Sequence, residues 1–446
     1  MKKDFSLKLI LLLGLVNAIN GDSRTRVVCY YDTRSSSKTG LGKVMPVDIE
    51  PALSSCTHLV YGYAGLDATT FKIAPLRTNE ELDKTNGLYK QITSLKTKYP
   101  NLKILLSVGG DADVDPENEK LFYEKYLALL ESSTGKIAFT NSVILILQDY
   151  GFDGLDLAFQ FPKMKPKKIR SSVGSVWHSF KKTIGVAGKP VDENSEQHKD
   201  QFTGLVVELK NSFRLEKYEL SVTVLPNVNA TLYLDVQSIK NYVDFITMAA
   251  FDVVTPIRNP KEADYPAPTL SVSDRNTEEN VDAWAAFLVS GGLPSYRVVI
   301  GVPSYGRAWK IEADATVTGS PPVQADGPAP EGVQTRTAGL FSYTEMCDKI
   351  LNTRNKDLKG EYAPLRKIAD PTKRYGIYAF RLPDENGDYG MWVGYEDPES
   401  AGNKAAFVRG KGFGGIALFD LSLDDVKGAC HGTKFPILER IKNKFN

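Results

Sequence analysis

The stretch that decides the fold is Phe152-Asp153-Gly154-Leu155-Asp156-Leu157-Ala158-Phe159-Gln160-Phe161-Pro162. Its centre, Gly154–Phe159, is a short and nearly continuous apolar run. Such runs are typical of parallel β-strands that are buried on both faces. In folds built from parallel strands, functional side chains gather where the strands end. The stretch therefore predicts a buried strand with candidate site residues at its carboxyl end.

Seven further apolar runs of this kind alternate with longer helical patterns such as Glu80–Tyr99 and Asn118–Tyr150. Eight strands with intervening helices predict an α/β fold, the (β/α)8 TIM barrel. The alternative is a doubly wound open sheet, but no G-x-G-x-x-G motif opens a helix after the first strand. The other predicted strands are Val27–Tyr31, His58–Tyr63, Lys103–Val108, Glu219–Leu225, Asp244–Phe251, Arg297–Val302 and Gly415–Leu421.

Two spacers are too long for simple crossovers. The first, Lys163–Lys199, is polar and rich in lysine. The second holds the Pro/Gly-rich run Pro321–Gly332 and a helical pattern at Tyr343–Asn352. Structureless loops of such length are uncommon in compact domains. We therefore expect an inserted α+β subdomain at 309–391, between strands seven and eight, and a barrel at 21–308 and 392–446.

The N-terminus has the pattern of a secretory signal peptide. Lysines at 2, 3 and 8 precede the apolar run Leu9–Val16, and small residues follow at Ala18 and Gly21. The run is shorter than the roughly 20 residues that a membrane span needs. The alternatives are a membrane anchor or an apolar N-terminal strand. We expect a signal peptide at 1–20, no membrane span elsewhere, and a secreted, extracellular protein.

Charge and cysteine content narrow the class of protein further. The 55 basic and 54 acidic residues give a net charge of +1, which offers no global argument for nucleic acid or anionic membranes as partners. Four cysteines predict two disulfides in an oxidising compartment, and four cysteines allow three pairings. No C-x-x-C motif occurs and the four histidines are scattered, so we expect no metal and no cofactor.

The opening stretch resembles the fourth strand of the family 18 chitinases, which carries D-G-x-D-x-D-W-E-Y-P. The resemblance covers nearly all of the chain after the leader. It implies a chitinase-type barrel, in which the glutamate protonates the glycosidic oxygen and the N-acetyl group of the substrate acts as the nucleophile. The other matching stretches are Cys56–Tyr61, Leu106–Gly110, Gly301–Arg307, Trp392–Pro398 and Gly414-Gly415.

This sequence departs from the family pattern at each catalytic position. Gln160 stands in place of the acid, and Ala158 in place of the aspartate that orients the acetamide. Phe251 replaces a tyrosine and Phe419 replaces the tryptophan beneath the reacting sugar. The resemblance therefore implies an inactive homologue rather than an enzyme. We expect the remaining aspartates, Asp153, Asp156 and Asp252, to be structural.

Binding of a chito-oligosaccharide without hydrolysis is the second hypothesis. Sugar faces stack on aromatic rings, yet Arg34 and Asp111 fall where the family has tryptophans. Four aromatic residues are candidates for lining a shortened groove, and the alternative is that they belong to the core. They are Tyr31, Tyr63, Tyr305 and Phe419.

A narrower resemblance is to the imaginal disc growth factors, secreted and catalytically inert insect relatives of the chitinases. It rests on Gln160, the lysine-rich Pro162–Lys168 and Phe419. It implies a monomeric growth or morphogenesis factor that promotes cell proliferation and tissue remodelling. A cell-surface receptor or extracellular protein and insulin-type peptides are the candidate partners. The basic insert Lys163–Lys182, with Trp177 and Phe180, is either a binding surface or a solvated loop.

The resemblance also implies the disulfide pairing Cys29–Cys56 and Cys347–Cys430. Independently of the resemblance, Asn229-Ala230-Thr231 is the only N-x-S/T sequence in the chain. It follows a predicted strand in a turn-like segment, so we expect N-glycosylation at Asn229.

Overall fold

The computed structural model describes residues 25–113, 121–167, 169, 192–311, 319–384 and 389–445. The predicted signal peptide at 1–20 lies outside these ranges, as do Trp177, Phe180 and most of the basic insert.

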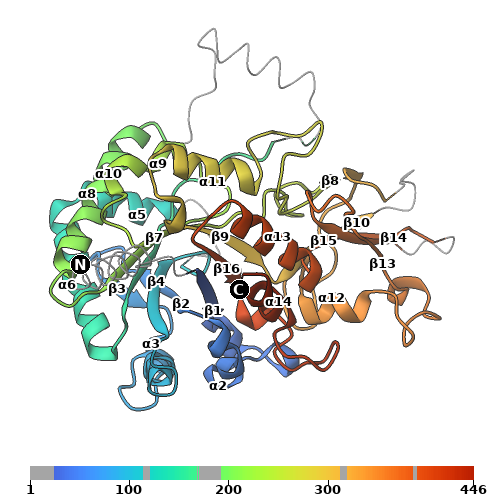
Figure 1. Cartoon of the computed structure of the whole chain (residues 1–446), viewed down its shortest axis with the longest axis horizontal. Helices are drawn as coiled ribbons and strands as arrows, with labels where there is room; N and C mark the ends of the chain where they lie inside the picture. The colour runs from blue at the N-terminus through green and yellow to red at the C-terminus, as the bar shows by residue number, and fades with distance from the viewer. Residues whose placement is uncertain are drawn as a thin grey trace, which may run out of the picture.

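Eight parallel strands close into a barrel, with helices around its outside (Figure 1). The ring closes where β1 pairs with β2, from Val28 opposite His58 to Asp32 opposite Gly62. A short strand, β3 (Ile73–Pro75), adds to β2 in the antiparallel direction. This confirms the predicted TIM barrel. Its strands are β1 (Arg26–Asp32), β2 (His58–Leu66), β4 (Lys103–Gly109), β5 (Gly154–Ala158), β6 (Glu219–Val224), β7 (Phe245–Met248), β9 (Val298–Pro303) and β16 (Gly415–Phe419).

The barrel strands form because almost every residue in them faces either the interior or the surrounding helices. All nine residues of β2 and all five of β5 are buried. Gly154 allows β5 to approach β6, because a Cβ at this position would lie 2.1 Å from the carbonyl oxygen of Glu219. The surrounding helices are α2 (Pro46–Ile49), α3 (Thr78–Glu81), α4 (Leu88–Ser94), α5 (Leu121–Glu131), α6 (Ser133–Tyr150), α8 (Ser195–Phe213), α9 (Ala230–Tyr233), α10 (Val236–Ile239), α11 (Val281–Ser290), α13 (Pro398–Gly410) and α14 (Pro436–Phe445).

An inserted α+β unit lies between β9 and β16 in the sequence, beside the barrel (Figure 1). Trp309 and Trp392 pack on one face of its antiparallel sheet, with ring centroids 5.7 Å apart, and Ala308 and Val393 pack on the other. The first strand begins at Tyr305 and the last ends at Tyr395, so the sheet extends past the expected bounds of 309 and 391. The sheet has the order β12 (Leu340–Ser342), β10 (Tyr305–Ile311), β15 (Gly390–Tyr395), β14 (Ile377–Arg381) and β13 (Arg366–Ile368); α12 (Tyr343–Lys349) follows β12, and β8 (Glu262–Ala263) pairs with β11 (Val323–Gln324).

Two predicted helices are broken. Asn118–Tyr150 divides into α5 and α6 at Ser132, whose side chain caps α6. The helical pattern Glu80–Tyr99 forms α3 and α4 with a turn between them. The Asp83 carboxylate accepts the backbone N–H groups of Thr85 and Asn86 at 2.7 and 3.1 Å, and so competes with the helical hydrogen bonds. For this reason, the prediction of one continuous helix over Glu80–Tyr99 was wrong.

Two disulfides join distant segments. Cys29 in β1 is bonded to Cys56, just before β2, and Cys347 in α12 is bonded to Cys430, beyond β16. The second therefore ties the inserted unit to the end of the chain. Among the described helices, none has the length and apolar character required to cross a membrane.

Candidate functional site at the open end of the barrel

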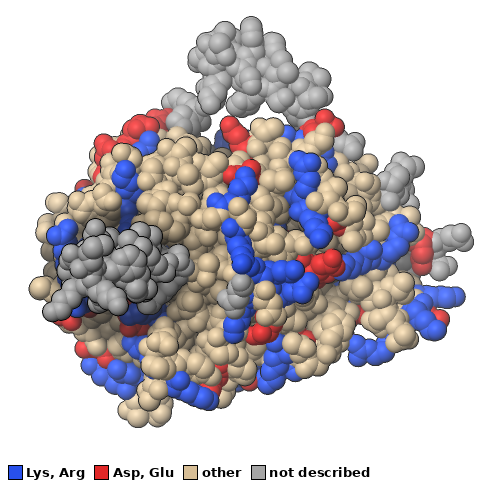
Figure 2. Space-filling view, viewed as in Figure 1, with Lys and Arg blue, Asp and Glu red and all other residues tan. Residues whose placement is uncertain are grey.

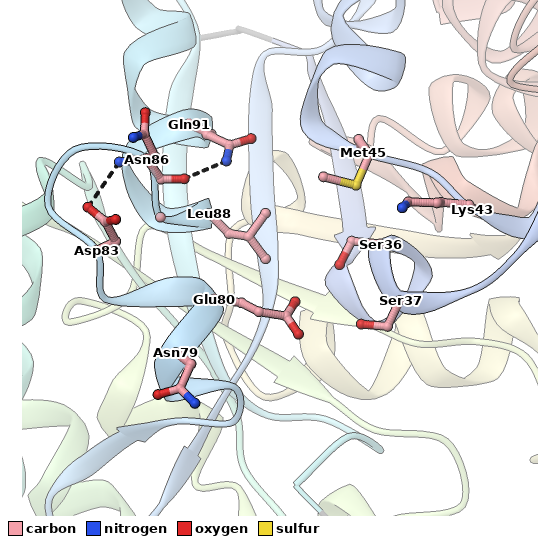
Figure 3. Close-up of a pocket in the computed structure, with 11 residues that line it drawn as sticks. Ser36, Ser37, Lys43, Met45, Asn79, Glu80, Asp83, Asn86, Leu88 and Gln91 are labelled. Atoms are coloured by element: carbon pink, nitrogen blue, oxygen red, sulfur yellow. Dashed lines mark hydrogen bonds between the residues drawn. The ribbon is translucent and has the colours of Figure 1, made fainter.

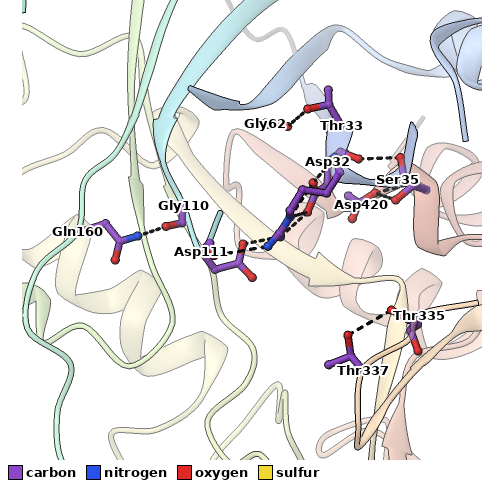
Figure 4. Close-up of polar contacts among 12 residues, drawn as sticks. Asp32, Thr33, Ser35, Gly62, Gly110, Asp111, Gln160, Thr335, Thr337 and Asp420 are labelled. Atoms are coloured by element: carbon purple, nitrogen blue, oxygen red, sulfur yellow. Dashed lines mark hydrogen bonds and ion pairs between the residues drawn. The ribbon is translucent and has the colours of Figure 1, made fainter. Parts of the chain in front are cut away.

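Four strands bring polar side chains to one end of the barrel (Figure 4). Asp32 ends β1, Asp111 follows β4, Gln160 follows β5 and Asp420 follows β16. Because all these strands are parallel, their carboxyl ends meet at the same edge. We call this end the barrel mouth.

Gln160 is held as a structural amide. Its side chain is 4% exposed, and its Nε2 donates a hydrogen bond to the carbonyl oxygen of Gly110 (Figure 4). The backbone N–H of Gly110 in turn donates to the carbonyl oxygen of Ala158 at 2.9 Å. An amide carries no proton that titrates in the ordinary pH range, and Ala158 adds no polar side chain. Neither residue can act as a general acid or base.

Asp156 lies inside the barrel and accepts hydrogen bonds from four hydroxyl groups. It is fully buried, and burial raises the pKa of its carboxyl group, although the hydroxyl donors lower that pKa in part. The donors are Ser107 and Ser221 at 2.7 Å, Thr223 at 2.8 Å and Tyr30 at 3.2 Å.

Asp153 lies at the opposite end of β5 from Gln160. Its carboxylate accepts the backbone N–H of Ile104 at 2.8 Å and pairs with Lys96 at 3.1 Å. These contacts tie the start of β5 to β4. The two aspartates of the motif are thus separated from each other and from Gln160.

An aromatic cluster fills the barrel beneath the mouth. Phe419 stacks on Tyr30, with centroids 3.9 Å apart, and lies 5.0 Å from Phe251. Phe251 meets Tyr305 edge to face at 6.1 Å. Each of these four rings is less than one-tenth exposed. They pack on one another and leave little ring surface for a ligand.

The other two aromatic candidates lie apart from this cluster. Tyr31 has no exposed surface, and its hydroxyl donates to the carbonyl oxygen of Val44 at 2.7 Å, outside the barrel. Tyr63 is 8% exposed and packs against Gly110, where a Cβ would lie 2.4 Å from its ring. Tyr31 therefore does not reach the mouth.

Charged side chains cross the mouth instead. Arg34 forms a bidentate pair with Asp32 and a further pair with Asp111 at 2.9 Å. The Asp111 side chain is 70% exposed, and the positive charges of Arg34, Lys163 and Arg307 hold the pKa of its carboxyl group below its usual value. Asp111 is consequently a stable anion that joins the ends of β1 and β4 through Arg34.

Asp252 forms an ion pair with Arg307, in β10 of the inserted unit. Arg307 donates to its carboxylate through Nε at 2.7 Å, and the hydroxyl of Tyr305 donates at 2.8 Å. The Asp252 backbone has a positive φ of 56°, and its carbonyl oxygen accepts from Asn227 at 2.9 Å. These contacts fix the end of β7 to β10.

Asp420 is the most perturbed acid of the mouth. Burial, and then the nearby carboxylate of Asp32, raise the pKa of Asp420 to about 7. Its Oδ1 accepts the backbone N–H of Ser422 at 2.6 Å. Sequence reasoning did not single out Asp420 or Tyr30; the only signal was their position at and next to strand ends.

Asn229 caps α9 and is partly exposed. Its Oδ1 accepts the backbone N–H of Thr231 at 3.1 Å and the Thr231 hydroxyl at 2.7 Å. The Nδ2 atom, to which a glycan is attached, makes no hydrogen bond with any described residue.

The surface carries charges of both signs. On the face seen in Figure 2, Lys and Arg side chains gather in a band around α13 and α14 and toward β13, with Asp and Glu among them. Lys367 of β13, for example, pairs with Asp397 at the start of α13.

Comparisons with known proteins give a consistent result. The model of the glycosyl hydrolases family 18 matches residues 26–424. The chain is 49% identical to Bacteria-responsive protein 1 of Aedes aegypti over 97% of this chain and 98% of that protein. It is 48% identical to Imaginal disk growth factor 6 of Drosophila melanogaster, over 94% of this chain and 93% of the other. Among solved structures, human YKL-39, described as a pseudo-chitinase with retained chitooligosaccharide binding properties, superposes with a TM-score of 0.71 at 26% identity and covers 94% of this chain and 99% of its own.

Proposed function

Because this chain belongs to glycosyl hydrolase family 18 and its relatives include imaginal disc growth factors, we propose that it is a secreted, catalytically inactive growth and morphogenesis factor. The single observation that carries the proposal is the state of Gln160. An amide bonded to a backbone carbonyl stands at the end of β5, where the family resemblance expects a glutamic acid.

The surroundings of Gln160 support the loss of catalysis. A retained site would need a second polar group beside the acid, but Ala158 and Phe251 have apolar side chains. Loss of a positioned general acid alone costs roughly 10²–10⁴-fold in rate. We therefore expect no measurable turnover of chitin.

Two features of the chain support secretion. Residues 1–20 have the pattern of a signal peptide, and all four cysteines are paired in disulfides, which persist in oxidising compartments. Outside the cell, the chain would act by binding a receptor or another extracellular protein. We propose insulin-type peptides as further partners in promoting growth. The family likeness to growth factors is what supports this step, since a fold does not fix a function.

A growth assay tests the proposal. We would add the purified secreted protein to dividing insect epithelial cells, with and without insulin, and compare it with the Gln160→Glu variant. Both proteins should raise cell number equally, because the activity requires no chemistry at position 160. No rise with either protein would contradict a growth-factor role, and a rise with the Gln160→Glu variant alone would contradict the claim that the growth activity does not depend on position 160.

A non-hydrolytic lectin for chitin or N-acetylglucosamine oligosaccharides is the second candidate. The name of the solved human relative, a pseudo-chitinase that keeps chitooligosaccharide binding, favours it. Against it, Tyr63, Tyr305 and Phe419 are each less than one-tenth exposed here. Retention on chitin beads, with loss in a Phe419→Ala variant, is the result that would favour the lectin.

A further inference from the structure

A hollow of about 530 Å³ lies between two segments on the outside of the barrel (Figure 3). One wall is the loop that leaves β1, with Ser36, Ser37, Lys43 and Met45. The opposite wall is the segment that carries α3 and α4. Neither Gln160 nor the Arg34 ion pairs line it.

Arg77 ties the two walls together. One guanidinium nitrogen donates to the hydroxyls of Ser36 and Ser37 at 2.7 and 3.2 Å and pairs with Glu80 at 3.0 Å. Next to it, the buried Glu81 accepts the backbone N–H of Arg77 at 2.8 Å. These contacts fix the width of the hollow without a ligand.

The wall is also anchored to the barrel itself. The hydroxyl of Tyr61, in β2, donates to the other carboxylate oxygen of Glu81 at 2.6 Å. Glu81 has no exposed surface, and burial raises the pKa of its carboxyl group. The short helix α3 therefore cannot shift without breaking a buried hydrogen bond.

The far end of the hollow is fixed by hydrogen bonds of the turn before α4. Asp83 accepts the backbone N–H of Asn86 at 3.1 Å, and Nε2 of Gln91 donates to the backbone oxygen of Asn86 at 2.6 Å. Both bonds use backbone groups of Asn86. Its side-chain amide, like that of Asn79 and the ammonium group of Lys43, makes no hydrogen bond with the described residues.

The side chains that line the hollow indicate which kind of ligand it would bind. Hydroxyl and amide groups predominate. Glu80 is paired with Arg77, which leaves Lys43 and Asp83 as charges of opposite sign, so the lining has no strong excess of one sign. Met45 and Leu88 supply a small apolar wall. Amides and hydroxyls suit a ligand with many hydroxyl groups, and the apolar wall suits the C–H face of a sugar ring. The volume lies in the range of small-ligand sites, roughly 300–1,000 Å³.

We propose that this hollow binds a neutral saccharide about the size of a disaccharide. A peptide would fit less well, because only Met45 and Leu88 offer apolar surface for its side chains. The site goes beyond the proposed growth-factor role and does not depend on it. It is also distinct from the barrel mouth, where the lectin hypothesis would place a chito-oligosaccharide.

Saturation-transfer NMR on the full secreted protein tests the site, with chitobiose, cellobiose and trehalose as probes. The expected Kd is on the order of 1 mM, so each probe is used at about 10 mM. The variant Asn79→Ala/Asn86→Ala removes two free amides from the lining. The matched control, Asn211→Ala/Asn443→Ala, removes two exposed amides elsewhere. A third variant, Asp111→Asn, alters the mouth alone.

We expect at least one of the probes to bind, with roughly tenfold weaker affinity in the Asn79/Asn86 variant and unchanged affinity in the other two. Equal thermal midpoints of all variants would show that they fold. Absence of saturation transfer from every probe would overturn the proposal. Binding that survives in the Asn79/Asn86 variant but falls in Asp111→Asn would also overturn it and place the sugar in the mouth. Either failure leaves the growth assay, and so the proposed function, unaffected.

Discussion

Replacement of Asp156 by alanine should destabilise the barrel strongly while leaving its surface unchanged. The carboxylate is fully buried and accepts bonds from four hydroxyl groups. A net value of about 1 kcal/mol for each lost bond gives about 4 kcal/mol. The gain from no longer burying a carboxyl group whose pKa is raised by burial offsets part of this, so we expect ~3–4 kcal/mol.

The Asp156→Asn variant separates hydrogen bonding from charge. An amide keeps one acceptor oxygen, and the hydroxyls of Ser107 and Ser221 can rotate to accept from its NH₂ group. We therefore expect a smaller loss, about 1–2 kcal/mol. A surface control, Asp149→Ala, removes a carboxylate that is half exposed and paired with Lys84, and should cost less than about 0.5 kcal/mol.

Urea unfolding followed by tryptophan fluorescence measures the three free energies. Thermal unfolding gives a second readout. If the chain unfolds in a single cooperative transition, a loss of ~4 kcal/mol lowers its midpoint temperature by about 5 °C for a chain of this size. An alanine variant as stable as the unaltered protein would refute the reasoning. Equal losses of free energy in the alanine and asparagine variants would show that the amide oxygen of asparagine does not stabilise the hydroxyl groups any better than no acceptor does.

Three further predictions concern the mouth and the surface. The pKa of Asp420 is raised to about 7 from 3.8, so the native state holds more protons than the unfolded state between about pH 4 and 7. The free energy of unfolding should therefore fall as pH rises through that window. In urea unfolding, Asp420→Asn should flatten this decline, and an unchanged slope would count against the raised pKa. The single change Gln160→Glu should not restore hydrolysis of chitohexaose, because Ala158 and Phe251 remain; appreciable release of reducing ends would show that these supporting positions matter less than we argue. If Asn229 carries a glycan, Asn229→Gln and treatment with an N-glycosidase should lower the mass of the secreted protein equally, whereas an unglycosylated mass before treatment would contradict the prediction.

The barrel strands could be predicted because parallel strands buried on both faces leave short apolar runs in the sequence. Lys103–Val108, for example, differs from β4 by one residue. The end of β7 could not be found in this way. The strand stops at Met248 rather than at Phe251, because the N–H groups of Ala250 and Phe251 bond to carbonyls only two residues earlier and Asp252 takes a positive φ.

Because the strands are apolar on both faces, the sequence did not predict which of their residues point into the barrel and which point outward. Tyr30 and Tyr31 are adjacent and both are buried, yet only Tyr30 points into the barrel, where it meets Asp156 and Phe419. Alternation along a strand assigns faces only when one face is polar. The sequence predicted loss of the catalytic acid at Gln160, but the Arg34–Asp111 ion pair depends on how two loops meet, which no local pattern reveals.

Calorimetric titration of the secreted protein with chitohexaose, with reducing ends assayed in the same samples, tests the central claim most directly. The account predicts neither binding heat nor released ends, because the mouth is crossed by ion pairs and its rings are buried. Micromolar binding without hydrolysis would favour the lectin over the growth factor. Steady release of reducing ends would contradict the claim that the barrel is catalytically inactive.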